Sequence, residues 1–72
     1  MKISYDDECD AMSITFKETT VTAKRVGEGV ALEFDAAGHL AGIEILDAVR
    51  RFGTGETLRK VILENVGSAS SA

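Results

Sequence analysis

The chain has 72 residues, 44% of them hydrophobic, with a formal net charge of −4 and a single cysteine. This length allows one domain, and one cysteine excludes both a disulfide framework and a cysteine-rich zinc site. The acidic balance disfavours binding to nucleic acid, and no stretch approaches the roughly 20 apolar residues that cross a membrane. We therefore expect one cytoplasmic domain over residues 1–66, followed by a small, polar, disordered tail over residues 67–72.

The first part of the chain is predicted to form three strands. Residues 2–5 make a short strand, and after an acidic turn residues 11–16 alternate apolar and polar side chains, as a half-buried strand does. Residues 19–26 are rich in β-branched residues, and the charges of Lys24 and Arg25 suit a strand at the edge of a sheet.

The stretch from residue 30 to residue 46 predicts a β-hairpin. Apolar residues alternate with other residues over 30–34 and again over 40–46. Between the two strands, Asp35 can hold a turn with its side chain, and Gly38 can supply the positive φ that the turn needs. The hairpin is therefore expected to have Gly38 in the left-handed region.

The two hairpins resemble each other at an offset of 29 residues. Asp6 lies 29 positions before Asp35, and Ile14 lies 29 positions before Ile43. Cys9 stands where the second loop has its glycine, and cysteine is a poor choice for positive φ. We therefore expect the first loop to take a different conformation from the second.

The period of the apolar residues changes after Asp47, which is a preferred helix N-cap residue. Residues 48–52 are predicted to form a short helix that Gly53 ends. Apolar residues at helical spacing predict a second helix over residues 56–66, and the rival interpretation is a sixth strand. The expected fold class is α+β, an antiparallel β-meander of about five strands with C-terminal helix packed on one face.

The segments MKISYDDECDAMSITF and GEGVALEFDAAGHLAGIEILDA resemble the domain-of-unknown-function family 2283 of small prokaryotic proteins. The resemblance covers about residues 1–52. The chain departs from the family pattern at Asp7, where proline is expected, and at Met12, where leucine is commoner. The matching positions are Tyr5, Asp6, Asp10, Ala11, Gly29, Asp35 and Gly42 to Ala48.

The resemblance implies no activity, because the family has none established. Its members are often encoded beside small toxin-like proteins, which implies an antitoxin or partner role. The small basic, RNase-like toxin implied in this way is one candidate partner of the chain.

Three residues are candidates for a small catalytic or ligand-binding site. His39, the single histidine, can pair with Asp35 or Glu44 as an acid–base couple, because imidazole titrates near neutrality. No recognisable motif places a Ser or Cys nucleophile beside them. An exposed residue at the start of a strand is the favoured interpretation of His39.

Two acidic features have a functional and a structural interpretation. Glu44 and Asp47 could form a paired-carboxylate site, but an exposed strand residue and a helix cap are preferred. The acidic cluster around Cys9 lacks the spacing of a calcium-binding loop and is interpreted as a solvated turn. We expect no metal and no cofactor.

The leading functional hypothesis is a non-enzymatic protein-interaction module that forms a homodimer or larger assembly. A chain this short buries a modest core, and one short helix covers only part of a five-stranded face. A second copy is the simplest cover. The alternatives are an antitoxin-like partner of a small toxin, or a small ligand-binding or enzymatic protein that uses Asp35, His39 and Glu44.

Overall fold

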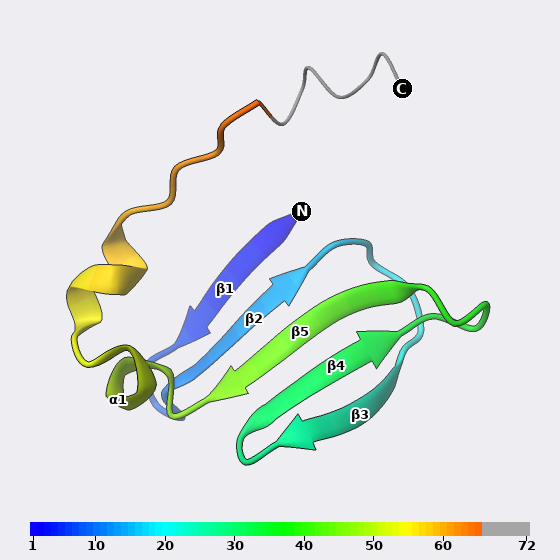
Figure 1. Cartoon of the computed structure of the whole chain (residues 1–72), viewed down its shortest axis with the longest axis horizontal. Coiled ribbons are helices and arrows are strands. Elements are labelled where there is room, and N and C mark those ends of the chain that lie inside the picture. Colours follow the sequence, from blue (N-terminus) through cyan, green and yellow to red (C-terminus); the bar gives the residue numbers. More distant parts are fainter. Residues whose placement is uncertain (66–72) are drawn as a thin grey trace.

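The computed structural model of the protein describes residues 1–65 and contains a five-stranded antiparallel sheet (Figure 1). Its elements are β1 (Lys2–Asp6), β2 (Ala11–Thr15), β3 (Thr22–Gly27), β4 (Val30–Phe34), β5 (Leu40–Leu46), the helix α1 (Ala48–Phe52) and the 3-10 helix η1 (Gly55–Arg59). The α+β class and the number of strands are confirmed. The predicted tail at residues 67–72 lies outside the described residues.

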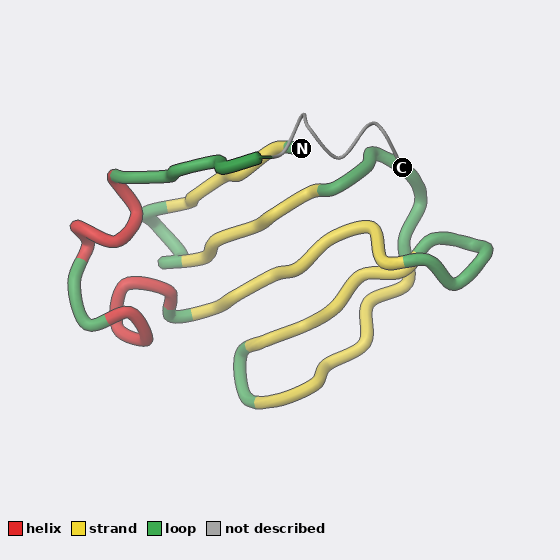
Figure 2. The backbone as a smooth tube through the Cα atoms, turned by 45° about the horizontal axis from the view of Figure 1, so that its top comes forward, coloured by secondary structure: helices red, strands yellow, loops and turns green. Residues whose placement is uncertain are grey.

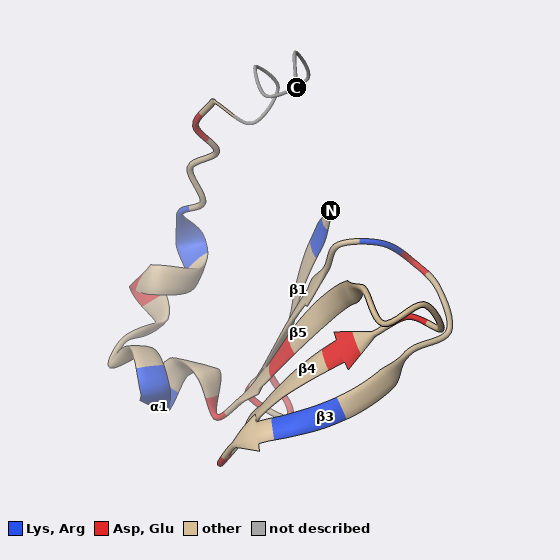
Figure 3. Cartoon of the chain, turned by 45° about the vertical axis from the view of Figure 1, so that its right-hand side comes forward, with Lys and Arg blue, Asp and Glu red and all other residues tan. Residues whose placement is uncertain are grey.

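The strand order is β1-β2-β5-β4-β3, which differs from the meander predicted from the sequence. The longest strand, β5, lies in the middle, where both of its edges are hydrogen-bonded. β3 lies at an edge, as the charges of Lys24 and Arg25 predicted, and Figure 3 shows its basic stretch. A meander would have placed these two cations in the central strand, where fewer side chains reach solvent.

The 29-residue offset of the sequence reappears as a local two-fold relationship within the sheet. Ile14 of β2 pairs directly with Ile43 of β5, and these are equivalent positions of the two hairpins. The neighbouring pairs follow the same rule, because Ile3 faces Ile14 as Leu32 faces Ile43. The two hairpins therefore meet along their second strands.

The two hairpin loops share their first turn and then diverge. In each loop the leading aspartate, Asp6 or Asp35, accepts the amide hydrogen of the residue two positions later at 3.0 Å. The second loop has its positive φ at Gly38, at 85°, as predicted. The first loop avoids it at Cys9 and uses Asp10 instead, at 51°, because aspartate tolerates the left-handed region better than cysteine.

The C-terminal helices are short and lie beyond the end of the sheet (Figure 2). α1 and η1 contact each other. The helix predicted over residues 56–66 is reduced to η1, and residues 60–64 are neither helix nor strand. The β-branched residues Val61 and Ile62 lower helix propensity, which accounts for this difference.

The core within residues 1–65 consists of three small side chains. Ala31, Ala41 and Ala48 are 8%, 1% and 0% exposed, and no large side chain is fully buried. The larger apolar residues of the strands stay half-buried or exposed. The sheet is therefore a single layer, whereas stable domains are built from at least two packed layers.

Side chains alternate between the two faces along each strand, and residues paired across strands lie on the same face. The registers therefore assign the strand residues to one apolar face and one polar face. The apolar face carries Ile3, Tyr5, Met12, Ile14, Val30, Leu32, Ile43, Ile45 and, on β3, Lys24. The polar face carries Lys2, Ser4, Ser13, Thr15, Arg25, Glu33 and Glu44.

Candidate functional site

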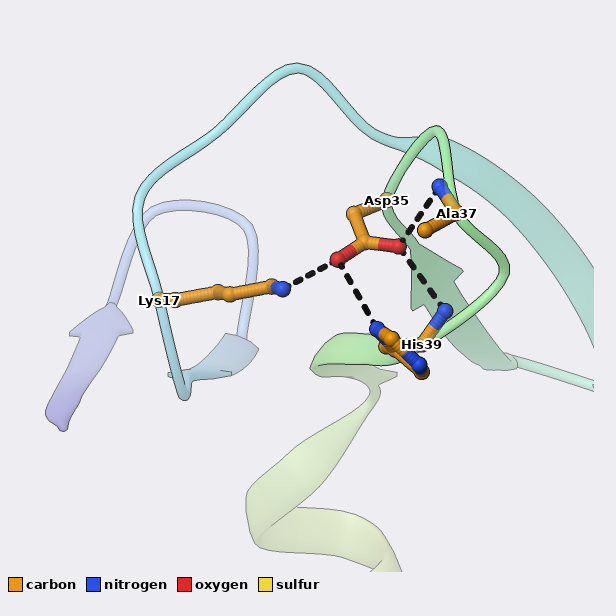
Figure 4. A network of polar contacts seen from close by, with 4 residues as sticks. All are labelled: Lys17, Asp35, Ala37 and His39. Carbon is orange, nitrogen blue, oxygen red and sulfur yellow. Dashed lines mark hydrogen bonds and ion pairs between the residues drawn. The ribbon is translucent and has the colours of Figure 1, made fainter.

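Asp35 organises the turn between β4 and β5 (Figure 4). Its Oδ1 accepts the amide hydrogens of Ala37 at 3.0 Å and His39 at 2.8 Å. Its Oδ2 forms an ion pair with the Lys17 ammonium group, and its side chain is 9% exposed. The connection between β2 and β3, to which Lys17 belongs, is thereby joined to the turn that it passes.

The same contacts keep Asp35 ionised. The hydrogen bond from Lys17, followed by the amide of His39, lowers the pKa of the Asp35 carboxyl to about 2. Nδ1 of His39 lies 3.8 Å from Oδ2, and the His39 side chain is 76% exposed. A carboxylate whose two oxygens already accept hydrogen bonds is a poor general base. This cluster is therefore suited to holding the β2–β3 connection against the β4–β5 turn, and not to proton transfer.

Glu44 does not join Asp35 and His39. It lies in β5, five residues after His39, which corresponds to about 15 Å at the rise per residue of a strand. Its side chain belongs to the polar face and lines an open cavity of about 400 Å³ near the β1–β2 loop. The other lining residues are Ser4, Tyr5, Asp6, Cys9, Ala11, Ser13 and Leu46. The three residues of the predicted acid–base site are therefore split between two places.

Asp47 takes the N-cap position of α1, as predicted, but Asp10 supplies the side-chain hydrogen bond to the first turn of the helix. Asp47 has a φ of 54° and makes no side-chain cap hydrogen bond. The backbone oxygen of Asp10 accepts the amide hydrogen of Ala48 at 2.9 Å. Its Oδ1 accepts from the amide of Val49 at 2.9 Å and from the Tyr5 hydroxyl at 2.7 Å. Glu44 is among the residues that line the open cavity, whereas Asp47 forms an ion pair with Arg50 at 3.8 Å.

The contacts of Asp10 perturb two pKa values in opposite directions. The amide of Val49, followed by the Tyr5 hydroxyl, lowers the pKa of the Asp10 carboxyl. The hydrogen bond to Asp10 raises the pKa of Tyr5 to about 12. The sequence offered only an indirect signal for this role, since Asp10 is one of the positions shared with the family pattern.

Arg51 connects two distant segments through side-chain hydrogen bonds, a role that sequence reasoning did not identify. Its Nε donates to the carbonyl of Leu46 at 2.8 Å, and its guanidinium also donates to the carbonyl of Glu28. These bonds join the end of β5 to the β3–β4 turn. A Cβ at Gly29 would collide with the guanidinium, so the glycine leaves room for this side chain.

The acidic turn between β1 and β2 remains a surface feature. Cys9 is exposed, and residues 1–65 contain no group of three or more His, Cys, Asp or Glu side chains placed to hold a metal ion. No helix within the described residues is long and apolar enough to cross a membrane.

Comparison with known proteins gives one assignment. Neither the curated proteins nor the solved structures include a significant match to the chain. A family model described as "Protein of unknown function (DUF2283)" matches residues 2–48, which span β1 to the start of α1 and so include both hairpins. Because the match covers more than half of the chain, the protein belongs to the DUF2283 family.

Proposed function

We propose that this protein is a non-enzymatic interaction module that self-associates through the apolar face of its sheet. The observation that carries the proposal is the absence of large buried side chains within residues 1–65, where the core is made of three alanines. Ile3 and Tyr5 on this face are 40% and 39% exposed. A second layer is what such a sheet lacks, and another molecule can provide it.

The distribution of charge favours a second copy as that layer. Among the described strands, Lys24 on the edge strand β3 is the charged side chain of the apolar face, whereas the acidic Glu33 and Glu44 lie on the polar face. Two apolar faces can therefore meet without bringing the net charge of −4 into the interface. A two-fold axis makes such a contact self-complementary.

The size of the face is adequate for a specific contact. Five strands at about 4.8 Å spacing and about five residues in length cover on the order of 400 Å² in projection. Two copies would together bury roughly 1,000 Å² of accessible surface, since the surface of the side chains is larger than its projection. This area reaches the lower limit of specific interfaces. Two such sheets would pack about 10 Å apart, with strands within about 30° of parallel.

The enzymatic alternative has less support because its three residues do not converge. Asp35 is engaged by donors on both oxygens, and Glu44 belongs to a different part of the sheet. The family resemblance also implies a small basic protein as partner. Such a partner would leave the isolated chain monomeric and so is distinguished by the same experiment.

Sedimentation equilibrium at micromolar concentration tests the proposal with a matched pair of variants in β2. We expect the wild-type chain at twice its 7.7 kDa mass. Ile14→Lys places a charge on the apolar face and should yield monomers, whereas Ser13→Lys places the same charge on the polar face and should leave the dimer intact. A wild-type chain at the monomer mass would overturn the proposal.

A second measurement covers the case in which Ile14→Lys does not fold. The thermal midpoint of a wild-type dimer rises with protein concentration, because association stabilises the folded chain by mass action. A midpoint independent of concentration over about a hundredfold range would contradict self-association without recourse to any variant.

A further inference from the structure

Residues 60–64, here called the arm, form an exposed apolar segment after η1. Val61, Ile62 and Leu63 are 57%, 63% and 68% exposed. Lys60, at the start of the arm, already has the backbone of a strand, with φ −132° and ψ 119°. Three consecutive large apolar residues with this exposure are unusual on a soluble chain unless they pack against something.

The sheet has one protected edge and one unprotected edge. The edge strand β3 carries the cations Lys24 and Arg25, and a register shift between Arg25 and Gly27 interrupts its ladder (Figure 3). Both features discourage the addition of another strand. At the opposite edge, β1 pairs with β2 in an unbroken register over Lys2–Asp6. Within residues 1–65, β1 is an edge strand with no partner strand on its outer side, so its outer backbone groups can pair with a further strand.

The charges of the arm and of β1 match in antiparallel register. Both segments have five residues and begin with lysine, and both end with an acid, Asp6 in β1 and Glu64 in the arm. Antiparallel pairing places Lys60 opposite Asp6 and Glu64 opposite Lys2, whereas parallel pairing would oppose like charges. Lys2 now lies 3.4 Å from Glu18 in a pair that is largely exposed and readily exchanged.

The same register also matches the two faces of the sheet. It places Val61 opposite Tyr5 and Leu63 opposite Ile3, so both arm residues extend the apolar face. Ile62 falls on the polar side. A slip of one residue would move Val61 and Leu63 to the polar face and would break both charge pairs, so the register is well specified.

The path of the chain brings the arm to the correct end of β1. Asp10, just after β1, binds the first turn of α1 through the amides of Ala48 and Val49. From η1 the arm then runs in the direction opposite to β1 (Figure 1). Gly53 ends α1 and Gly55 begins η1, and a Cβ at either would meet open space, so the short connection between the two helices can rotate at these glycines.

We propose that the arm of the same chain closes onto the free edge of β1 as a sixth, antiparallel strand. Rotation at Gly53 and Gly55 moves η1 and the arm together, and the backbone hydrogen bonds of the new ladder replace bonds to water. Closure covers the outer groups of β1 and adds Val61 and Leu63 to the apolar face. The proposal does not depend on self-association, because the pairing is within one chain.

Amide hydrogen exchange of the full chain tests closure, with β3 as an internal control. We expect the outward-facing amides of β1 to exchange at least about tenfold more slowly than those of β3. A chain that ends at Arg59 should lose this difference. Equal exchange at the two edges, or protection of β1 that survives removal of the arm, would overturn the proposal.

Two further results separate the arm of the same chain from other occupants. Lys2→Glu and Glu64→Lys should each accelerate exchange at β1, and the double variant, which restores the charge pair with reversed sign, should recover the protection. A ratio of protection between β1 and β3 that increases with protein concentration would assign the edge to another copy and would refute closure within the chain, because association through the apolar face stabilises both edges together.

Discussion

The carboxylate of Asp10 lies 2.9 Å from the amide nitrogen of Val49, a residue 39 positions later in the chain. Five residues are far too few for a stable isolated helix, so α1 depends on contacts with the rest of the fold, and this bond to its first turn is one of them. The loop of the first hairpin therefore supplies the cap for a helix that follows the second hairpin.

Replacing Asp10 by Asn should lower the pKa of Tyr5 from about 12 toward 10, because the hydrogen bond to the charged carboxylate favours the protonated phenol. Asn tolerates the φ of 51° at this position, so the backbone of the loop is retained. The ultraviolet absorbance of the phenolate reports this titration cleanly, since the chain has one tyrosine and no tryptophan.

The control for this titration is Asp47→Asn, which makes the same change of charge at a residue without a role in the pKa of Tyr5. Since the folded pKa of Tyr5 is raised, its contribution to stability is complete below pH 10 and disappears as the pH rises through about 12. A pKa of Tyr5 that is unchanged in Asp10→Asn would contradict the hydrogen bond.

The pH dependence of stability should carry the signature of Asp35. Its pKa is lowered from 3.8 to about 2 in the folded chain, so its contribution is present above pH 3.8 and disappears as the pH falls through about 2. Urea unfolding of the wild type and of Asp35→Asn should therefore differ at neutral pH and converge at pH values near and below 2. A difference that is constant with pH would show that the carboxylate charge is unimportant.

Replacing Gly38 by Ala should destabilise the protein by about 1 kcal/mol, because its φ of 85° strains any residue with a Cβ. The matched control is Gly27→Ala, since Gly27 is not among the residues of positive φ and its Cβ would also meet open space. Urea melts that show equal stability for the two variants would place the strain elsewhere.

Replacing His39 by Ala should change the free energy of unfolding by no more than about 0.5 kcal/mol. The side chain is 76% exposed, and the bond that matters to Asp35 comes from the His39 backbone, which alanine retains. The mass of the assembly should also be unchanged. A folded His39→Ala variant that loses the cellular role of the protein would revive the catalytic interpretation.

Local features of this fold were predictable because neighbouring residues determine them. The strand segments, the positive φ at Gly38 and the edge position of β3 all follow from side-chain alternation, turn chemistry and charge. The different conformation at Cys9 also followed from residue type alone. Periodicity, however, gives no information about which strands pair, and this is why the meander was wrong.

The candidate site was harder to predict because its decisive contacts are long-range. Asp47 precedes a helix and has the right chemistry for a cap, but its left-handed backbone turns its side chain away from that task. Asp10 and Arg51 act on residues 39 and 23 positions away, and no local pattern marks such partners. Glu44 is only five residues from His39 in the sequence, but the extended backbone of β5 places it far along the sheet.

The seam between β2 and β5 implies an order of events in folding. Each hairpin joins residues close in sequence and can form in about 1–10 µs, whereas the seam joins Ile14 to Ile43 and must wait until both hairpins exist. Changes within a hairpin loop should therefore alter the folding rate less than changes along the seam. We therefore expect the docking of two similar halves to limit the rate of folding. A chain in which one half has formed then exposes an edge that its own second half, or that of a neighbouring molecule, can occupy.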